Sequence, residues 1–167
     1  GNVCLAFPQQ VLTFNPYQIT LQPLLGTGAG DDFIQSFTDS RGRVWVGTFR
    51  KGIYLKDGDK VSHFMQEDVP NKDIDYNIVR DFAEDHQHQI WVCYHGGVGR
   101  FDEKTKRIFP LRNKLFVGNT NINSIVFDRQ HRLWAATNKG LIMGNQLKLK
   151  AVCKALAIDK QGWIWVG

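Results

Sequence analysis

Three short stretches of the chain combine cationic, aromatic and amide side chains beside turn-forming residues. Side chains of these types can stack on a flat ligand and hydrogen-bond to its hydroxyl groups, which is the chemistry typical of a carbohydrate site. The stretches are Phe49-Arg50-Lys51, Tyr94-His95 and Asn138-Lys139. From them we predict the following ligand-binding residues: Arg50, Lys51, Tyr94, His95, Asn138 and Lys139.

The histidines do not form a catalytic set. His86, His88 and His131 lie in turns that we expect on a different face from the predicted ligand residues, and His95 has no acid fixed beside it. The sequence contains no Gly-x-Ser-x-Gly element, no pair of catalytic carboxylates and no cluster with metal-ligand spacing. We therefore predict no catalytic residue, no metal site and no cofactor, and a binding module is favoured over an enzyme.

The three cysteines, Cys4, Cys93 and Cys153, include no CxxC pair and no nearby histidine at ligand spacing, so a zinc site is not expected. A Cys4–Cys153 disulfide is compatible with an oxidising compartment, although nothing in the sequence requires it. Cys93 replaces the Gly47 of a corresponding segment, and we expect it to be a small buried residue.

Four segments repeat one pattern: an alternating apolar stretch, an Asp, a short polar turn, a Trp and a turn marked by Gly. The Asp residues stand at positions 39, 85, 128 and 159, and the Trp residues at 45, 91, 134 and 165. Each Asp precedes its Trp by six residues, while the repeats are 46, 43 and 31 residues apart. A fixed gap within a variable period predicts one retained hairpin with outer loops of different length. We expect each Asp to stabilise its turn, and each Trp to pack between repeats with its indole N–H on a carbonyl.

A fainter copy opens the chain, because residues 11–25 match residues 98–112. Period-2 alternation divides one repeat into four strands. In the best-defined copy these are residues 77–83, 90–94, 98–101 and 107–111.

Four short antiparallel strands in a unit of forty-odd residues indicate a β-propeller blade. We predict an all-β protein with about four blades, belonging to a seven-bladed propeller that would need roughly 300 residues. The expected divisions of residues 1–167 are blade remnants at 1–25, blades at 33–66, 77–112 and 121–153, and a half blade at 155–167. The chain is therefore expected to be a fragment of a larger propeller.

The order of strands in a blade decides which loops share a face. The loop between the second and third strands lies on the same side as the connection to the next blade, so that face receives the predicted ligand residues. It also receives further polar and aromatic residues: Asp73, Asp75, Tyr76, Asn77, Asn119, Thr120 and Asn121. The opposite face is composed mostly of turn Asp, Gly and Lys residues.

These residues resemble the two-component regulator propeller repeat, whose pattern is roughly D-x-x-G-x-[LI]-W-V-G-T followed by a Gly-led strand. DSRGRVWVGTFRKGIY (39–54) carries that pattern almost whole, and DKQGWIWVG (159–167) carries its first half. DHQHQIWVCYHGGVGRFD (85–102) and DRQHRLWAATNKGLIM (128–143) keep the spacing but replace the turn Gly and parts of WVGT. WD-repeat and kelch patterns fit less well.

The resemblance implies the periplasmic sensor region of a hybrid two-component histidine kinase, part of an inner-membrane receptor. Such receptors read oligosaccharides and signal across the membrane, so the implied partners are an oligosaccharide, the rest of the propeller and sensor chain, and a second copy in a homodimer. The alternatives are a propeller scaffold that binds only proteins and a propeller enzyme similar to streptogramin lyases. The family supplies no motif for ligand residues.

Composition and charge agree with a soluble globular protein. Hydrophobic residues make up 43% and charged residues 22%, and no apolar run approaches the roughly 18–20 residues needed to span a bilayer. The net charge of +5 is scattered, with Lys148, Lys150 and Lys154 as its loose cluster, whereas nucleic-acid binders concentrate such charge. We predict no nucleic-acid partner, and the positive balance favours an acidic glycan.

Overall fold

The structure is a computed structural model that describes residues 3–8, 10–15, 20–26, 32–67, 74–112, 116 and 120–167. These residues form five antiparallel sheets, which we number blades I to V in chain order. Blade I contains β1 (Val3–Phe7), β2 (Gln10–Asn15) and β3 (Thr20–Gly26). Blade II contains β4 (Phe33–Thr38), β5 (Val44–Thr48), β6 (Ile53–Asp57) and β7 (Lys60–Phe64).

The later sheets repeat this arrangement. Blade III contains β8 (Asp75–Glu84), β9 (Ile90–His95), β10 (Gly97–Asp102) and β11 (Arg107–Pro110). Blade IV contains β12 (Ile122–Phe127), β13 (Leu133–Thr137), β14 (Leu141–Met143) and β15 (Gln146–Leu149). Blade V contains β16 (Leu156–Ile158) and β17 (Ile164–Val166).

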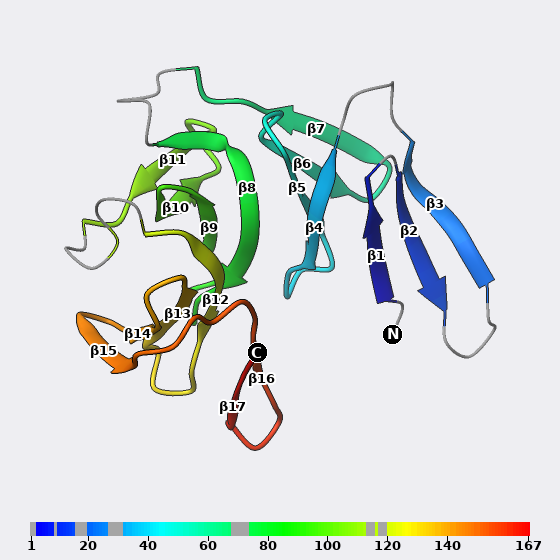
Figure 1. The fold of residues 1–167 in the computed structure, drawn as a ribbon. Helices are drawn as coiled ribbons and strands as arrows, with labels where there is room; N and C mark the ends of the chain where they lie inside the picture. Colours follow the sequence, from blue (N-terminus) through cyan, green and yellow to red (C-terminus); the bar gives the residue numbers. More distant parts are fainter. Residues whose placement is uncertain are drawn as a thin grey trace.

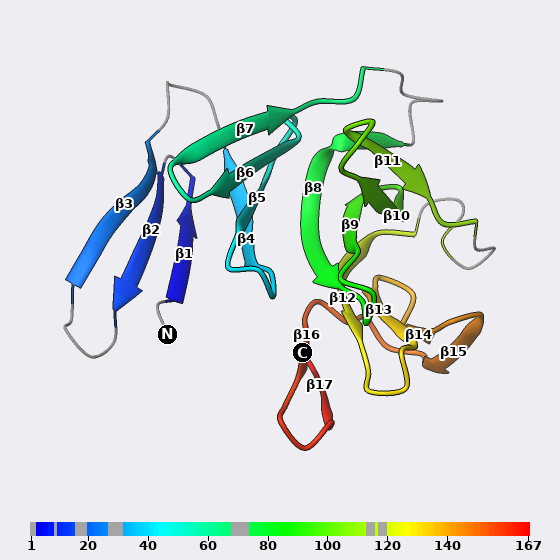
Figure 2. The ribbon, with the colours of Figure 1, turned by 180° about the vertical axis from the view of Figure 1, so that it is seen from behind.

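The sheets follow one another in chain order around an arc (Figures 1 and 2). The first strands of consecutive blades lie along its inner side (Figure 1), and each contacts the next: β4 with β8, β8 with β12, and β12 with β16. The predicted all-β architecture with four-stranded blades is confirmed, and so are the four strands predicted within blade III. The four strands of a blade are called A to D from the inner side outward, and the strands of blade I correspond to B, C and D.

Each turn between strands A and B is built around its Asp. In blade II, Asp39 Oδ1 accepts the backbone N–H groups of Arg41 and Arg43 at 3.0 and 2.9 Å, and Oδ2 accepts the indole N–H of Trp45 at 2.9 Å. The same pattern recurs at the other three turns, with indole-to-carboxylate distances of 2.8, 2.7 and 3.0 Å. The predicted turn function of Asp is confirmed. The expected carbonyl acceptor for the indole is wrong, because the Asp carboxylate lies within reach on the same hairpin.

The Trp residues face the next blade. Trp45 is fully buried and lies 5.3 and 6.3 Å, ring centre to ring centre, from Phe101 and Phe82 of blade III. Trp91 lies 5.7 Å from Phe127 of blade IV in the same way. The predicted packing of Trp between repeats is therefore confirmed at these two seams. Trp165 is 62% exposed.

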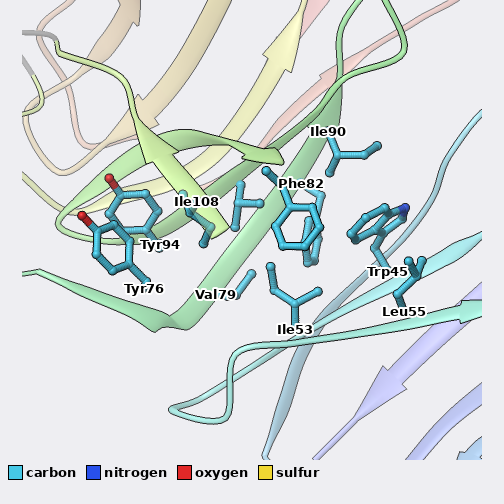
Figure 3. Packing of buried hydrophobic residues seen from close by; sticks show 11 residues of the cluster. Trp45, Ile53, Leu55, Tyr76, Val79, Phe82, Ile90, Tyr94 and Ile108 are labelled. Carbon is cyan, nitrogen blue, oxygen red and sulfur yellow. The ribbon is translucent and has the colours of Figure 1, made fainter. Parts of the chain in front are cut away.

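The hydrophobic core is divided among the seams between consecutive blades. The largest cluster joins blades II and III, with Trp45 at one end and the adjacent rings of Tyr76 and Tyr94 at the other (Figure 3). Gly47 lies at this seam, where an added Cβ would come within 2.7 Å of the Val79 side chain. The close approach of β8 therefore explains why position 47 is a glycine in this blade.

Two polar contacts join neighbouring blades near this core. Asp81 of β8 accepts Gln35 Nε2 of blade II at 3.1 Å and the backbone N–H of Ile125 in blade IV at 2.9 Å, so one buried carboxylate connects three blades. Burial raises the pKa of Asp81 despite these hydrogen bonds. Arg43 donates two parallel hydrogen bonds to Glu103 of blade III at 2.8 and 2.9 Å while its Nε bonds Asp39 at 2.7 Å.

The cysteines are free thiols. Cys93 is buried as expected, and its thiol donates to the backbone carbonyl of Ile122 at 3.3 Å. Cys4 lies beside Thr38 at the seam of blades I and II, and Cys153 donates to the carbonyl of Ala151 after blade IV. A Cys4–Cys153 disulfide is not formed, because the two residues belong to separate core clusters.

Replacing Trp45 with Phe is expected to destabilise the chain much more than the same change at Trp165. At Trp45 the change leaves a cavity in the seam and removes a buried hydrogen bond to Asp39, at a cost of about 2–3 kcal/mol in the free energy of unfolding. Trp165 occupies the equivalent position but is largely exposed, so we expect less than about 0.5 kcal/mol there. Urea denaturation followed by far-UV circular dichroism measures both; equal losses would contradict the seam packing.

The chain is expected to lose stability as the pH falls below about 4. Burial by itself raises the pKa of Asp39, but hydrogen bonds from Trp45 and Arg43 outweigh it, so the folded pKa lies below the ordinary value. A carboxyl with a lowered folded pKa stabilises the fold above its unfolded pKa and loses that contribution as the pH falls through the folded pKa. Asp39→Asn should therefore flatten the acid limb of the stability curve, measured by urea denaturation at a series of pH values. An acid limb that Asp39→Asn leaves unchanged would contradict this role of the carboxyl.

Candidate ligand-binding face

The turns between strands B and C lie against the segments that lead into strand A, as the strand order predicted. The N–H of Phe49 donates to the carbonyl of Asp32 at 2.8 Å, and the N–H of Asn138 donates to the carbonyl of Asn121 at 3.0 Å. The carbonyl of Asn77, in the first strand of the next blade, accepts the N–H groups of Arg50 and Gly52. These backbone contacts place the loops of one face together; we call it the B–C face.

A buried Thr fixes the B–C turn in two blades. The Thr48 hydroxyl donates to the Gly52 carbonyl at 2.9 Å and accepts the Lys51 N–H at 2.8 Å. Thr137 holds the turn of blade IV in the same way, through Gly140. In blade III the equivalent residue is Tyr94, whose ring fills the seam instead.

The B–C turn of blade II is one residue longer than its counterparts. Gly47 pairs with Ile53, six positions on, whereas Cys93 pairs with Val98 and Ala136 with Leu141, five positions on. Within this longer turn Arg50 adopts φ +97°. A side-chain-bearing residue is strained in that region, and such strain persists only where surrounding contacts hold it. Here the hydrogen bond from the Arg50 N–H to the Asn77 carbonyl, at 3.0 Å, holds it.

A hollow of about 640 Å³ opens beside this turn. It is lined by residues from the B–C turn, from β6 and β7, and from the segments flanking the blade: Asp32, Phe49, Arg50, Lys51, Tyr54, His63 and Met65. Its volume falls within the range usual for small-molecule sites. We call it the Arg50 hollow.

Aromatic rings order one wall of the Arg50 hollow. Tyr54 and His63 stack with their ring centres 4.2 Å apart and their planes inclined by 12°. His63 Nε2 donates to the Lys51 carbonyl at 2.6 Å, which fixes the imidazole and ties β7 to the B–C turn. The ring of Tyr54 also meets the edge of the buried Phe33 at 5.8 Å, so the wall rests on the core.

The Arg50 guanidinium lies over the face of Phe49, 5.1 Å from the ring centre. Within the part of the chain that the structure describes, no carboxylate forms an ion pair with it. Arg43 differs, because Asp39 and Glu103 occupy its guanidinium on two sides. Arg50 is thus an exposed, oriented cation, whereas Arg43 is a structural one.

The structure separates the six predicted ligand residues into several places. Arg50 and Lys51 line the Arg50 hollow, His95 is half-buried at the end of β9, and Asn138 and Lys139 are exposed at the turn of blade IV. Tyr94 is 2% exposed; burial raises its pKa, and its side chain belongs to the core. Of the additional residues assigned to this face, Asp73 and Asn119 lie outside the described residues.

Sequence reasoning missed Tyr54, His63, Met65 and the position of Asp32 beside Phe49. Tyr54 and His63 are paired neighbours on β6 and β7, so their stacking follows from the hairpin register. A count of residues across the turn Asp57–Lys60 would have placed them opposite each other, but it would not have shown that the longer B–C turn brings Arg50 to the same hollow.

On the opposite face, Ser40, Glu84 and His88 form a cluster with the residue types of a hydrolytic triad. The Ser40 hydroxyl donates to Glu84 and lies 2.9 Å from His88 Nδ1, and Glu84 Oε1 lies 2.9 Å from the same nitrogen. In a working triad the acid and the nucleophile occupy opposite ring nitrogens. Because both meet Nδ1 here, the cluster joins the turns of blades II and III and is not arranged for nucleophilic attack.

The rings of His86 and His131 stack on that same face with centres 3.9 Å apart, between the turns of blades III and IV. Among the residues described, no group of three or more His, Cys, Asp or Glu side chains is placed to hold a metal ion. Nor does any described helix have the length and apolar character needed to cross a membrane.

Blades of four antiparallel strands, joined at Trp-filled seams around an inner row of A strands, define the β-propeller class. Residues 117–139 match the model of the two component regulator propeller family. This segment is therefore similar to the repeat that the residue pattern predicted. No curated protein matches the chain.

Solved structures share the fold over nearly the whole chain. The extracellular domain assigned to the hybrid two component system BT3049 from B. thetaiotaomicron is 20% identical with a TM-score of 0.74, covering 99% of this chain and 25% of that one. The extracellular domain assigned to the one component system BT4673 from the same organism is 15% identical with a TM-score of 0.76, covering 99% and 24%. This chain thus spans about a quarter of the length of those domains.

An enzyme shares the fold as well. Virginiamycin B lyase from Staphylococcus aureus is 14% identical with a TM-score of 0.74, covering 99% of this chain and 59% of that one. The family match and the two extracellular domains belong to regulatory systems rather than to enzymes, in agreement with the expectation for this chain.

Arg50→Gly is expected to raise the free energy of unfolding by roughly 1 kcal/mol, because relief of the strained φ exceeds the added entropy of the unfolded chain. Lys51→Gly is the matched control: Lys51 has no positive φ, so the same change should lower stability by about 0.5–1 kcal/mol. Urea denaturation measures both, and a loss at Arg50 equal to that at Lys51 would show that the turn is not strained.

Proposed function

We propose that this chain is part of an extracytoplasmic sensor propeller of a two-component histidine kinase, and that its B–C face recognises an oligosaccharide. The observation that carries the proposal is the Arg50 hollow. It combines an exposed Phe49, a stacked Tyr54–His63 pair and several hydrogen-bonding side chains on the face where the strand order gathers the variable turns. Ligand pockets in proteins combine apolar rings with a few oriented polar groups in this way.

The family match and the extracellular location of the two similar domains support placement outside the cytoplasm, in the periplasm, within an inner-membrane receptor. In that setting the ligand acts by population shift: it binds one arrangement of a paired sensor more tightly and so favours the active state of the kinase. The dimer and the remaining blades belong to the longer receptor that the proposal implies.

Titration calorimetry with a panel of neutral and acidic oligosaccharides tests the proposal. We expect binding without turnover for at least one ligand, weakened by Ala at the accessible positions Arg50, Lys51, His95, Asn138 or Lys139. Tyr94 is omitted from this set because its side chain is part of the core. Lys60→Ala is the matched control, because Lys60 begins β7 at the turn that follows β6, on the face opposite the B–C turns. It removes the same charge as Lys51→Ala and should leave the affinity unchanged.

Three results would contradict the proposal. Affinity unchanged by all five substitutions would exclude the B–C face, product formation would indicate an enzyme, and no binding across the panel would favour a propeller that contacts only proteins.

A further inference from the structure

We propose that the Arg50 hollow recognises the acidic group of a sugar, a carboxylate or a sulfate ester, with the Arg50 guanidinium as its principal partner. This inference rests on the proposed function and deepens it, since it specifies the chemical class of the oligosaccharide. The net positive charge of the chain is scattered and does not by itself indicate an acidic ligand. The inference depends instead on the side chains that line the hollow.

The titratable side chains of the hollow are mainly basic. Arg50, Lys51 and His63 line it, and Asp32 is the acidic residue among the described lining residues. The basic residues Arg50 and Lys51 outnumber Asp32 around one opening, and this positive balance attracts an anion. A neutral sugar offers the Arg50 guanidinium no anionic group.

Arg50 is both oriented and available. Its guanidinium is held over Phe49, and no described carboxylate pairs with it, unlike Arg43. The planar fork of a guanidinium matches the two oxygens of a carboxylate or sulfate, giving a pair of parallel hydrogen bonds. An arginine already oriented by a ring loses less conformational entropy when it binds such a group.

The backbone conformation of Arg50 independently supports a binding role for its side chain. A glycine would adopt φ +97° without strain, and Gly96 adopts φ +93° in the B–C turn of blade III. In blade II this geometry is instead adopted by an arginine, at an energetic cost that a glycine would avoid. Strained residues with exposed functional side chains concentrate at binding sites, because the cost is retained only where the side chain is used.

Asp32 and the aromatic wall distinguish a sugar acid from a simple anion. The Asp32 carboxylate also lines the hollow, and its negative charge repels a second anionic group on the ligand. The same carboxylate accepts hydrogen bonds from hydroxyl groups. His63, Tyr54 and Phe49 offer ring surfaces that an inorganic anion cannot use. The ligand that satisfies the whole hollow therefore carries one acidic group, hydroxyl groups and an apolar ring face.

The experiment compares acidic oligosaccharides with their neutral counterparts by titration calorimetry. The probes are oligogalacturonates, mannuronate oligomers and sulfated chondroitin oligosaccharides, each paired with its carboxyl-reduced or desulfated form. We expect at least one acidic ligand to bind about tenfold or more tightly than its neutral form, and Arg50→Gly to remove most of that preference. Arg50→Gly suits this test because it relieves strain, so lost binding cannot be attributed to unfolding, which urea denaturation verifies.

Two further variants sharpen the comparison. Arg50→Lys keeps the charge but loses the planar fork, so its affinity should fall between those of the wild-type chain and Arg50→Gly. Lys60→Ala removes a positive charge from the opposite face and should retain the full preference for acidic ligands.

The outcomes separate this inference from the proposed function. Equal binding of acidic and neutral forms, or an acidic preference that Arg50→Gly leaves intact, overturns the inference while sugar recognition stands. Competition by inorganic sulfate as effective as that by the acidic sugar also overturns it, because the hollow would then be a simple anion site. Failure of every probe to bind overturns both.

Discussion

The fold depends on a carboxylate that performs two tasks at once. One oxygen of each turn Asp accepts the backbone N–H groups two and four residues later, and the other accepts the indole N–H of the Trp six residues later. The turn and the orientation of the ring are therefore set by the same side chain. Because the ring then projects from the hairpin towards the next blade, a contact within one hairpin determines how two blades meet.

Polar contacts join the blades in addition to the packing of the Trp residues. Asp81 connects the inner strands of three blades, Arg43 and Glu103 join blades II and III, and Ser40 with Glu84 joins their turns. Several of these contacts lie towards the face of the A–B turns, which is thereby occupied by structural hydrogen bonds. In blades II and IV the B–C turns are held by a buried Thr and by backbone hydrogen bonds, so the fold does not depend on their outward side chains. This division of tasks is the structural reason for proposing a ligand site on the B–C face.

The Arg50 hollow lies beside a B–C turn that has one added residue. In blades III and IV the B–C turn closes five residues after its start, whereas in blade II it closes after six. The longer turn brings Phe49, Arg50 and Lys51 outward, and the stacked Tyr54 and His63 form a wall beside them. The strain at Arg50 is held by the carbonyl of Asn77, a residue of the neighbouring blade, so the site uses the seam as its support.

The sequence by itself determined the repeat, the strands of blade III, the Asp turns and the face that carries Arg50 and Lys51. These features follow from local spacing: a gap of six residues between Asp and Trp, alternation along a strand, and the order of strands in a hairpin. Only the tertiary structure decided that the indole bonds the Asp carboxylate, that Tyr94 is a core residue, that Cys4 and Cys153 are apart, and that Tyr54 and His63 join Arg50 in one hollow. Those outcomes depend on which surfaces of separate hairpins meet, and spacing along one chain contains no measure of the distance between hairpins.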